Sequence, residues 1–352
     1  MQAIPSKLLA AMLIASTARA QERPEPPAAD STRPAPAAIF TSESPLAVTL
    51  SANLGALRSD RDSNPAWRAA ELRYAGDSGE RVLAVRARPR GIWRRKNCAF
   101  PPLRLDLPRK LTGGTPFEGL DRPKLVNYCR PTATGEQYVL AELQLYRVYA
   151  LLTPYSHRVR LLRITYADSA GDRGRGRGPS WGFLVEEPKA LAARAGMPRF
   201  EIQGVVGQEL DPYQSALMSM FQYLIGNTDF GISGLHNVEL LQRGEVFYPV
   251  PYDFDYAGAI NAAYAGPDPR LPIRKVTDRM YRGYCVPPEV LERVLALFRE
   301  KKDAIRALYF DEVGQLLRDD LRRQALRFFD GFYAEIASPA RARMSINNQC
   351  TR

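Results

Sequence analysis

Hydrophobic and polar residues alternate through most of the first half of the chain, from about residue 44 to residue 187. A period of two residues places one face of a strand against a core and the other towards water. The segments with this pattern are 45–51, 69–75, 81–89, 102–108, 124–128, 158–168 and 180–187. They predict a largely antiparallel sheet, interrupted by one helix at 136–152 that ends before Pro154.

The second half of the chain has helical patterns instead. The predicted elements are helices at 211–226, 288–309 and 312–337 and a hairpin at 238–250. The first of these helices has Asp211 as a candidate N-cap, Pro212 at its first position and Gly226 at its end. Arg243-Gly244 is expected to form the turn of the hairpin.

This order of elements predicts an α+β protein. With 352 residues, 45% of them hydrophobic, the chain is long enough to bury a sizeable core. We expect two lobes: a strand-rich N-terminal lobe at 44–187 with one main helix, and a helical C-terminal lobe at 188–352. Protein kinases and several unrelated α+β proteins share this arrangement, so function has to be argued from a site.

The N-terminus has the pattern of an export signal. Residues 1–20 contain an apolar run from Leu8 to Ala15 and end in Ala18-Arg19-Ala20, a small-x-small cleavage site. A retained membrane anchor is the alternative, but the run is shorter than the roughly 20 apolar residues that span a bilayer. We expect cleavage near Ala20, a Pro/Ala-rich linker at 21–43, and a periplasmic or extracellular protein without a transmembrane segment.

The formal net charge is +11, and much of the excess lies in the stretches 86–96 and 171–178. Such stretches can hold nucleic acid, anionic lipid or another polyanion. A solvated face or loop is the more common reason for a run of like charges. No aromatic residues are regularly interleaved with the basic ones, so we expect no specific nucleic-acid partner.

The four cysteines predict two disulfides, because bridges are permitted in an exported protein. Of the three possible connectivities, we expect Cys98–Cys129 and Cys285–Cys350, since each pair would then staple one half of the chain. Buried free thiols are the alternative. Wide spacing and the lack of a C-x-x-C pair argue against a zinc site.

Polar residues gather around the predicted hairpin. IGNTDFGISGLHN (225–237) precedes it, and YPVPYDFDYAG (248–258) follows from its second strand. A hairpin brings its two ends within roughly 5 Å, so Asn237 and Asp253 can share a ligand. Asparagine and aspartate oxygens suit Mg²⁺, and Asp229 is placed to orient a hydroxyl group and take its proton. The sequence thus predicts a phosphoryl-transfer site.

Local turn chemistry offers another explanation for each polar residue. A capped helix, a Gly/Ser turn and Asx turns would account for them one at a time. Asn227 is expected to brace the loop rather than touch a substrate. His236 either hydrogen-bonds this loop or is a structural histidine, and we name no partner for His157. No nucleophilic triad is visible.

The order of several short stretches between about residues 80 and 260 resembles that of the bacterial spore-coat CotH-type family of atypical secreted kinases. The matching stretches are RARPRG (86–91), KLVNYCR (124–130), the helix holding Glu142, GFLVEEPKALAARAG (182–196), GNTDF (226–230), HN (236–237) and PYDFD (251–255). The resemblance implies a two-lobed, protein-kinase-like fold that binds ATP with Mg²⁺ or Mn²⁺. The separation of eight residues between Asp229 and Asn237 is longer than the five of ordinary kinases.

The resemblance also implies roles for individual residues. Asp229 would be catalytic, and Asn237 and Asp253 would be metal ligands. Asp255 would be a second metal ligand or a loop cap. Lys124 would hold the α- and β-phosphates of ATP, and Glu142 would form an ion pair with Lys124. The alternative for Lys124 is a solvated lysine at the end of a strand, and the alternative for Glu142 is an exposed helix residue.

Three functions follow from these patterns. The first is an exported, Mg²⁺-dependent phosphotransferase that moves the γ-phosphoryl group of ATP to a hydroxyl group. The acceptor would be a protein, at serine or threonine, or a small molecule. The second is a non-catalytic kinase-like protein that binds a partner or an envelope component. The third is an exported polyanion-binding protein that uses the basic stretch 86–96.

Overall fold

The computed structural model describes residues 37–77, 79–171 and 177–351. The expected export signal at 1–20 and most of the linker therefore lie outside the described residues, as does most of the second basic stretch. Within the linker, Ile39 and Phe40 are described, and both are buried in the main core. The packed chain thus begins before residue 44, where we expected it to start.

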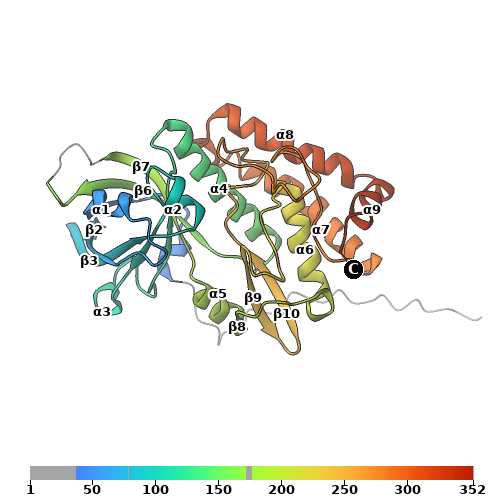
Figure 1. The fold of residues 1–352 in the computed structure, drawn as a ribbon, viewed down its shortest axis with the longest axis horizontal. Coiled ribbons are helices and arrows are strands. Elements are labelled where there is room, and N and C mark those ends of the chain that lie inside the picture. Colours follow the sequence, from blue (N-terminus) through green and yellow to red (C-terminus); the bar gives the residue numbers. More distant parts are fainter. Residues whose placement is uncertain (1–36, 78, 172–176, 352) are drawn as a thin grey trace, which may run out of the picture. The chain divides into compact units, whose positions relative to one another are not determined.

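Seven strands form a closed barrel in the order β1-β2-β3-β4-β5-β7-β6 (Figure 1). Their bounds are β1 (Leu46–Ala52), β2 (Arg68–Gly76), β3 (Gly79–Pro89), β4 (Leu103–Asp106), β5 (Lys124–Val126), β6 (Val159–Asp168) and β7 (Arg177–Val185). Each predicted strand segment of the first half is confirmed. The neighbouring pairs are antiparallel except β1 and β6, whose parallel pairing closes the barrel.

The predicted two-lobed, kinase-like fold with one main N-terminal helix is wrong. The strands make a closed, mixed barrel, and the described residues include nine α-helices. Three short ones lie among the strands: α1 (Leu54–Ser59), α2 (Trp93–Asn97) and α3 (Arg109–Thr112). The parallel contact that closes the barrel places Leu46 opposite Leu162. Alternation within a strand carries no information about so distant a partner, which is why the sequence pattern did not reveal closure.

Helix α4 (Ala133–Leu152) joins the barrel to the remaining helices. It contacts β6 and β7 on one side and α6 and α7 on another, and it is buried around most of its circumference. One hydrophobic core continues from Leu72 in β2 through Leu145 in α4 to Phe329 in α8. The helices that follow α4 are α5 (Pro188–Ala195), α6 (Pro212–Ile225), α7 (Pro288–Ala307), α8 (Asp319–Ile336) and α9 (Pro339–Asn347). Figure 1 shows α6, α7 and α8 close together.

The predicted elements of the second half are largely present. Asp211 caps α6 by accepting a hydrogen bond from the Gln214 amide at 2.7 Å, and Gly226 ends it at a φ of 64°. The hairpin consists of β9 (Val238–Arg243) and β10 (Val246–Pro251), to which β8 (Arg199–Phe200) adds a third strand. Its turn lies at Gly244 and Glu245, one residue later than predicted. The predicted helix 312–337 begins only at Asp319, after a 3₁₀ turn.

Both predicted disulfides, Cys98–Cys129 and Cys285–Cys350, are confirmed. The first connects the end of α2 to the segment that follows β5, and the second fastens the C-terminal segment after α9 to the loop before α7. In the described ranges, no helix combines the length and the apolar character needed to cross a membrane.

Candidate functional site

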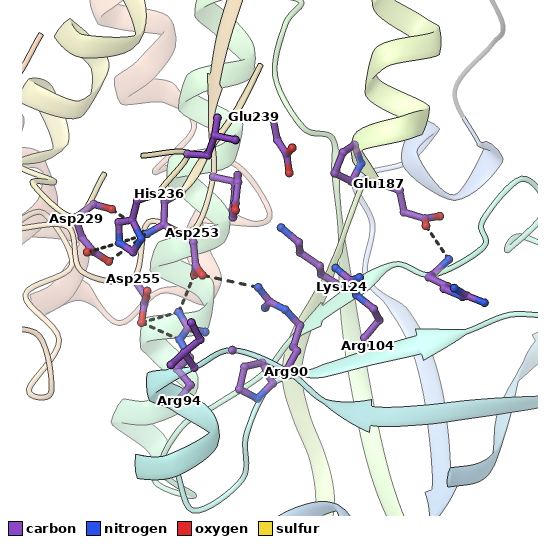
Figure 2. A pocket seen from close by; sticks show the side chains of 18 of the residues that line it. Arg90, Arg94, Arg104, Lys124, Glu187, Asp229, His236, Glu239, Asp253 and Asp255 are labelled. Atoms are coloured by element: carbon purple, nitrogen blue, oxygen red, sulfur yellow. Dashed lines mark hydrogen bonds and ion pairs between the residues drawn. The ribbon is translucent and has the colours of Figure 1, made fainter. Parts of the chain in front are cut away.

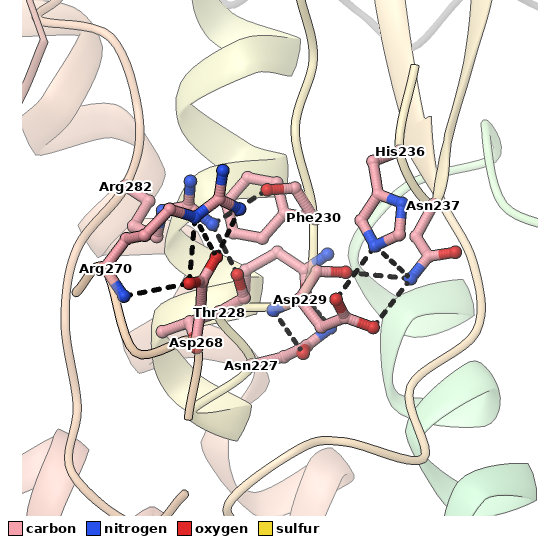
Figure 3. Close-up of polar contacts among 10 residues, drawn as sticks. Asn227, Thr228, Asp229, Phe230, His236, Asn237, Asp268, Arg270 and Arg282 are labelled. Atoms are coloured by element: carbon pink, nitrogen blue, oxygen red, sulfur yellow. Dashed lines mark hydrogen bonds and ion pairs between the residues drawn. The ribbon is translucent and has the colours of Figure 1, made fainter. Parts of the chain in front are cut away.

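The polar stretch that follows α6 is held in place by its own hydrogen bonds. After Gly226, the Asn227 amide donates to the Gln222 carbonyl at 2.9 Å and closes the helix end. The Asn227 side chain accepts from the Asp229 amide at 3.0 Å (Figure 3). It also donates to the Gln222 side chain at 3.1 Å. Asn227 is fully buried. It braces the loop, as predicted, and so fixes the backbone that carries Asp229.

Asp229, His236 and Asn237 lie in direct contact (Figure 3). One Asp229 carboxylate oxygen lies 2.8 Å from His236 Nε2, and the other accepts from Asn237 Nδ2 at 3.1 Å. The hydrogen bond to Asp229 raises the pKa of His236. Two backbone hydrogen bonds between Gly231 and His236 close the loop between these residues. The loop therefore brings Asp229 and Asn237 together despite the long separation along the chain.

Asp253 and Asp255 converge on one guanidinium group, that of Arg94 in α2 (Figure 2). Asp255 accepts from Arg94 Nε at 2.9 Å, and Asp253 accepts from Nη2 at 3.3 Å. Glu142 in α4 also accepts from Nη2, at 3.2 Å. Burial raises the pKa of Asp255, whereas at Asp253 the charges of Arg94 and Arg90 outweigh burial and lower the pKa. Asp253 thus remains ionised over a wider pH range than Asp255.

Three cations line the opposite side of the site (Figure 2). Arg104 in β4 and Lys124 in β5 are cross-strand partners, and Arg90 follows β3. Within the described chain, neither Arg104 nor Lys124 has a carboxylate within 4.0 Å, and Arg90 reaches Asp253 only at 3.8 Å. Lys124 Nζ lies 3.6 Å from the centre of the Tyr252 ring. Burial and the neighbouring Arg90 lower the pKa of Lys124 to about 7. The positive charge of this cluster favours the binding of an anion.

The acidic and basic groups border one open cavity of about 970 Å³. Its lining includes Asp229, His236 and Asn237 from one side and Arg90, Arg104 and Lys124 from the other. A ligand-sized volume with a few convergent polar groups is typical of a small-molecule site. The arrangement can hold an anion at one end and present a carboxylate to a hydroxyl group at the other.

Three residues of the cavity wall adopt the left-handed backbone conformation. Leu235 has a φ of 51°, Asn237 a φ of 54° and Asp253 a φ of 63°. Asparagine and aspartate adopt this conformation more readily than other residues with a side chain, whereas it is uncommon for leucine. The Asp253 amide donates to the Tyr146 hydroxyl at 2.9 Å, and the Tyr252 amide donates to the Asn237 carbonyl at 3.0 Å. The two ends of the hairpin thus meet as predicted, and Tyr146 of α4 holds the backbone at Asp253 in place.

The expected ion pair between Lys124 and Glu142 is not formed. Glu142 lies against Arg94 instead, and Lys124 lies over the Tyr252 ring. The physical reason is that α2 inserts Arg94 between α4 and the Asp253 loop. The run of basic residues at 86–96 predicts a solvated face or a polyanion site, yet Arg94 and Arg95 within it are buried. Apart from its position in a predicted strand, nothing in the sequence marks Arg104 as a residue of the cavity.

The remaining histidine is structural. His157 is buried, and its Nδ1 donates to the Glu186 carbonyl at 2.9 Å. Burial, with the charge of Lys124, lowers the pKa of His157 to about 3, so that the ring is neutral. It is not among the residues that line the cavity.

The predicted metal ligands fit a divalent cation only in part. Among the described residues, no group of three or more histidine, cysteine or acidic side chains is arranged to hold a metal. Asp255 is poorly suited because it is buried and occupied by Arg94. Asp253 is a quarter exposed, and the Asn237 side-chain oxygen carries no hydrogen bond from a described side chain. Two such ligands suit Mg²⁺, which usually binds through one or two protein groups together with substrate phosphates.

Comparison with known proteins gives no further assignment: the chain matches no family model and no curated protein.

Proposed function

We propose that this chain is an exported phosphotransferase that moves the γ-phosphoryl group of ATP to a hydroxyl group. The observation that carries the proposal is the pairing within one cavity of a cationic cluster, in which only Arg90 has a carboxylate within 4.0 Å among the described residues, and a hydrogen-bonded aspartate. Phosphate esters need the first, and hydroxyl activation needs the second. The two disulfides and the export signal expected at the N-terminus support export.

The cationic cluster would bind the phosphates. Arg104 and Lys124 lie side by side on neighbouring strands, so their charges act on one ligand. Arginine can bind phosphate oxygens through two parallel hydrogen bonds, whereas lysine acts as a point charge. Asp253 and Asn237 would hold Mg²⁺ together with the phosphates. When bound, Mg²⁺ neutralises the charge that develops on the transferred group.

Asp229 would orient the acceptor. Its carboxylate is 40% exposed and fixed by His236 and Asn237, so it can accept a hydrogen bond from a hydroxyl group. The acceptor oxygen forms a bond to the γ-phosphorus, and the bond from that phosphorus to the bridging oxygen breaks. The acceptor proton passes to Asp229, and the products are a phosphate ester and ADP.

A titration with ATP and Mg²⁺, followed by an assay for radiolabelled γ-phosphate, tests the proposal. We expect the wild-type protein to bind ATP and to transfer the label to water, to itself or to an added hydroxyl compound. Lys124→Met should weaken ATP binding by about tenfold or more, because it removes one charged contact. Lys301→Met, at a partly exposed lysine of α7 that lies outside the cavity lining, is the matched control and should have no effect.

Two other results would redirect the assignment. Binding of ATP without any transfer would favour the alternative of a non-catalytic, partner-binding protein. Binding of long polyanions with strong salt dependence, but not of ATP, would favour the polyanion-binding alternative. Either result would refute the phosphotransferase proposal.

A further inference from the structure

Arg94 is enclosed by three carboxylates from separate parts of the chain, two of which, Asp253 and Asp255, are labelled in Figure 2. Its guanidinium lies 2.6 Å from Asp255, 3.2 Å from Glu142 and 3.3 Å from Asp253. Glu142 comes from α4, and the two aspartates follow β10. We refer to these three carboxylates as the acidic cage.

Water contributes little to neutralising the acidic cage. Glu142 is 2% exposed, and the side chains of Asp255 and Arg94 are 6% and 10% exposed. One Glu142 oxygen, Oε1, is buried and has no hydrogen-bond partner. Removing the cation that is paired with a buried carboxylate is strongly destabilising. Arg94 is the cation that faces all three carboxylates. Their oxygen atoms are ligands of the kind that divalent ions prefer, but around the guanidinium group the described side chains are not arranged as a metal site.

The chain holds Arg94 firmly in this position. Arg94 lies in α2, whose C-terminal neighbour Cys98 is bonded to Cys129 after β5. The adjacent Trp93 packs against Tyr264, with 5.7 Å between the ring centres. These two attachments fix α2 on both sides of Arg94, so the guanidinium is a permanent part of the site rather than a mobile surface charge.

We infer that Arg94 is a built-in cation that takes the place of a metal ion in the acidic cage and positions Asp253 towards the cavity. Arg94 is thus a positioning residue, because it acts on a ligand through Asp253. One consequence rests on the proposed function. Because Arg94 occupies the acidic cage, a nucleotide bound in the cavity would bring one divalent ion, held by Asp253 and Asn237, rather than two.

Titration of the full protein with Mn²⁺ alone, followed by electron paramagnetic resonance, tests the inference without nucleotide or activity. Wild-type protein should show no specific Mn²⁺ site. Arg94→Ala should gain one site, with an affinity at least about tenfold above that of the wild type, because the acidic cage loses its cation. Adding Asp255→Asn to this variant should remove the gained site. Arg86→Ala is the matched control, because Arg86 pairs with Asp106, which lies outside the acidic cage.

Thermal unfolding keeps the inference testable if Arg94→Ala is unstable. Mn²⁺ should then raise the melting temperature of Arg94→Ala but not that of the wild type. A folded Arg94→Ala protein that gains no Mn²⁺ site would overturn the inference. A tight, nucleotide-independent Mn²⁺ site in the wild type that Asp255→Asn abolishes would also overturn it.

The number of Mn²⁺ ions bound with a non-hydrolysable ATP analogue tests whether a bound nucleotide brings one divalent ion or two. One ion per nucleotide is the expected result, and two would contradict it. If no nucleotide binds, the proposed function fails, whereas the nucleotide-free Mn²⁺ titration still decides the role of Arg94.

Discussion

Raising the pH from 6 to 9 should weaken anion binding in the cavity, because Lys124 loses its charge within this range. An ordinary lysine has a pKa of about 10.4 and would remain charged throughout. In this protein, burial and the charge of Arg90 lower the pKa of Lys124 to about 7. A bound anion stabilises the protonated amine, so binding takes up a proton, and its affinity falls as the pH rises above the pKa of the free site.

The size of this effect follows from the pKa change that the anion causes. An opposite charge within about 4–6 Å shifts a pKa by roughly 1–3 units, and each unit corresponds to about tenfold in affinity. The dissociation constant of sulfate, which keeps its charge over this range, should therefore rise about tenfold or more between pH 6 and 9. Isothermal titration calorimetry at several pH values measures this rise.

Lys124→Arg provides the decisive comparison, because arginine stays charged at every pH used. Its sulfate affinity should vary little with pH, whereas Lys301→Arg, a control in α7, should behave like the wild type. An equal pH dependence in Lys124→Arg and the wild type would refute the assignment of the effect to Lys124.

Three further predictions concern stability and protonation. Replacing both Cys98 and Cys129 by serine opens a link across 31 residues and should lower the free energy of unfolding by about 3–4 kcal/mol, measured by urea unfolding; unchanged stability would contradict it. Gly226→Ala should lower the free energy of unfolding by roughly 1–3 kcal/mol, because the residue has a φ of 64° and a Cβ atom would lie 2.5 Å from the Phe328 ring. An unchanged melting temperature would count against this packing. In a pH titration by nuclear magnetic resonance, His157 should stay neutral above about pH 4 and His236 should titrate above about 6.5, and protonation of His157 near 6.5 would disprove its burial.

The local features of this fold could be predicted because their causes are local. Alternation located the strands, and the Asp211 cap and the terminal Gly226 located α6. Closure of the barrel could not be predicted, since Leu46 and Leu162 carry no mark of their pairing. The helix expected at 312–337 begins late because Gly314 enters a 3₁₀ turn, in which a Cβ atom would lie 2.3 Å from the Leu308 carbonyl oxygen.

The candidate site was predictable in part for the same reason. Asp229, Asn237 and Asp253 lie close along the chain to one hairpin, so its geometry indicated their convergence. Arg94 comes from a distant segment, and a buried arginine in a run of basic residues has the same sequence pattern as a solvated one. The family resemblance implies Lys124 as the partner of Glu142, whereas the structure places Arg94 there, because a sequence does not show which cation lies nearest to Glu142.

Transfer of labelled γ-phosphate by Asp229→Asn, compared with the wild type at matched ATP saturation, tests the central claim most directly. We expect the wild type to transfer the label and Asp229→Asn to lose about 100-fold to 10,000-fold of the rate, the range for a general base, with little change in ATP affinity. Asp330→Asn, at an exposed ion pair in α8, should transfer at the wild-type rate. Equal rates for Asp229→Asn and the wild type would refute the role of Asp229, and no transfer by the wild type would refute the proposed phosphotransferase activity.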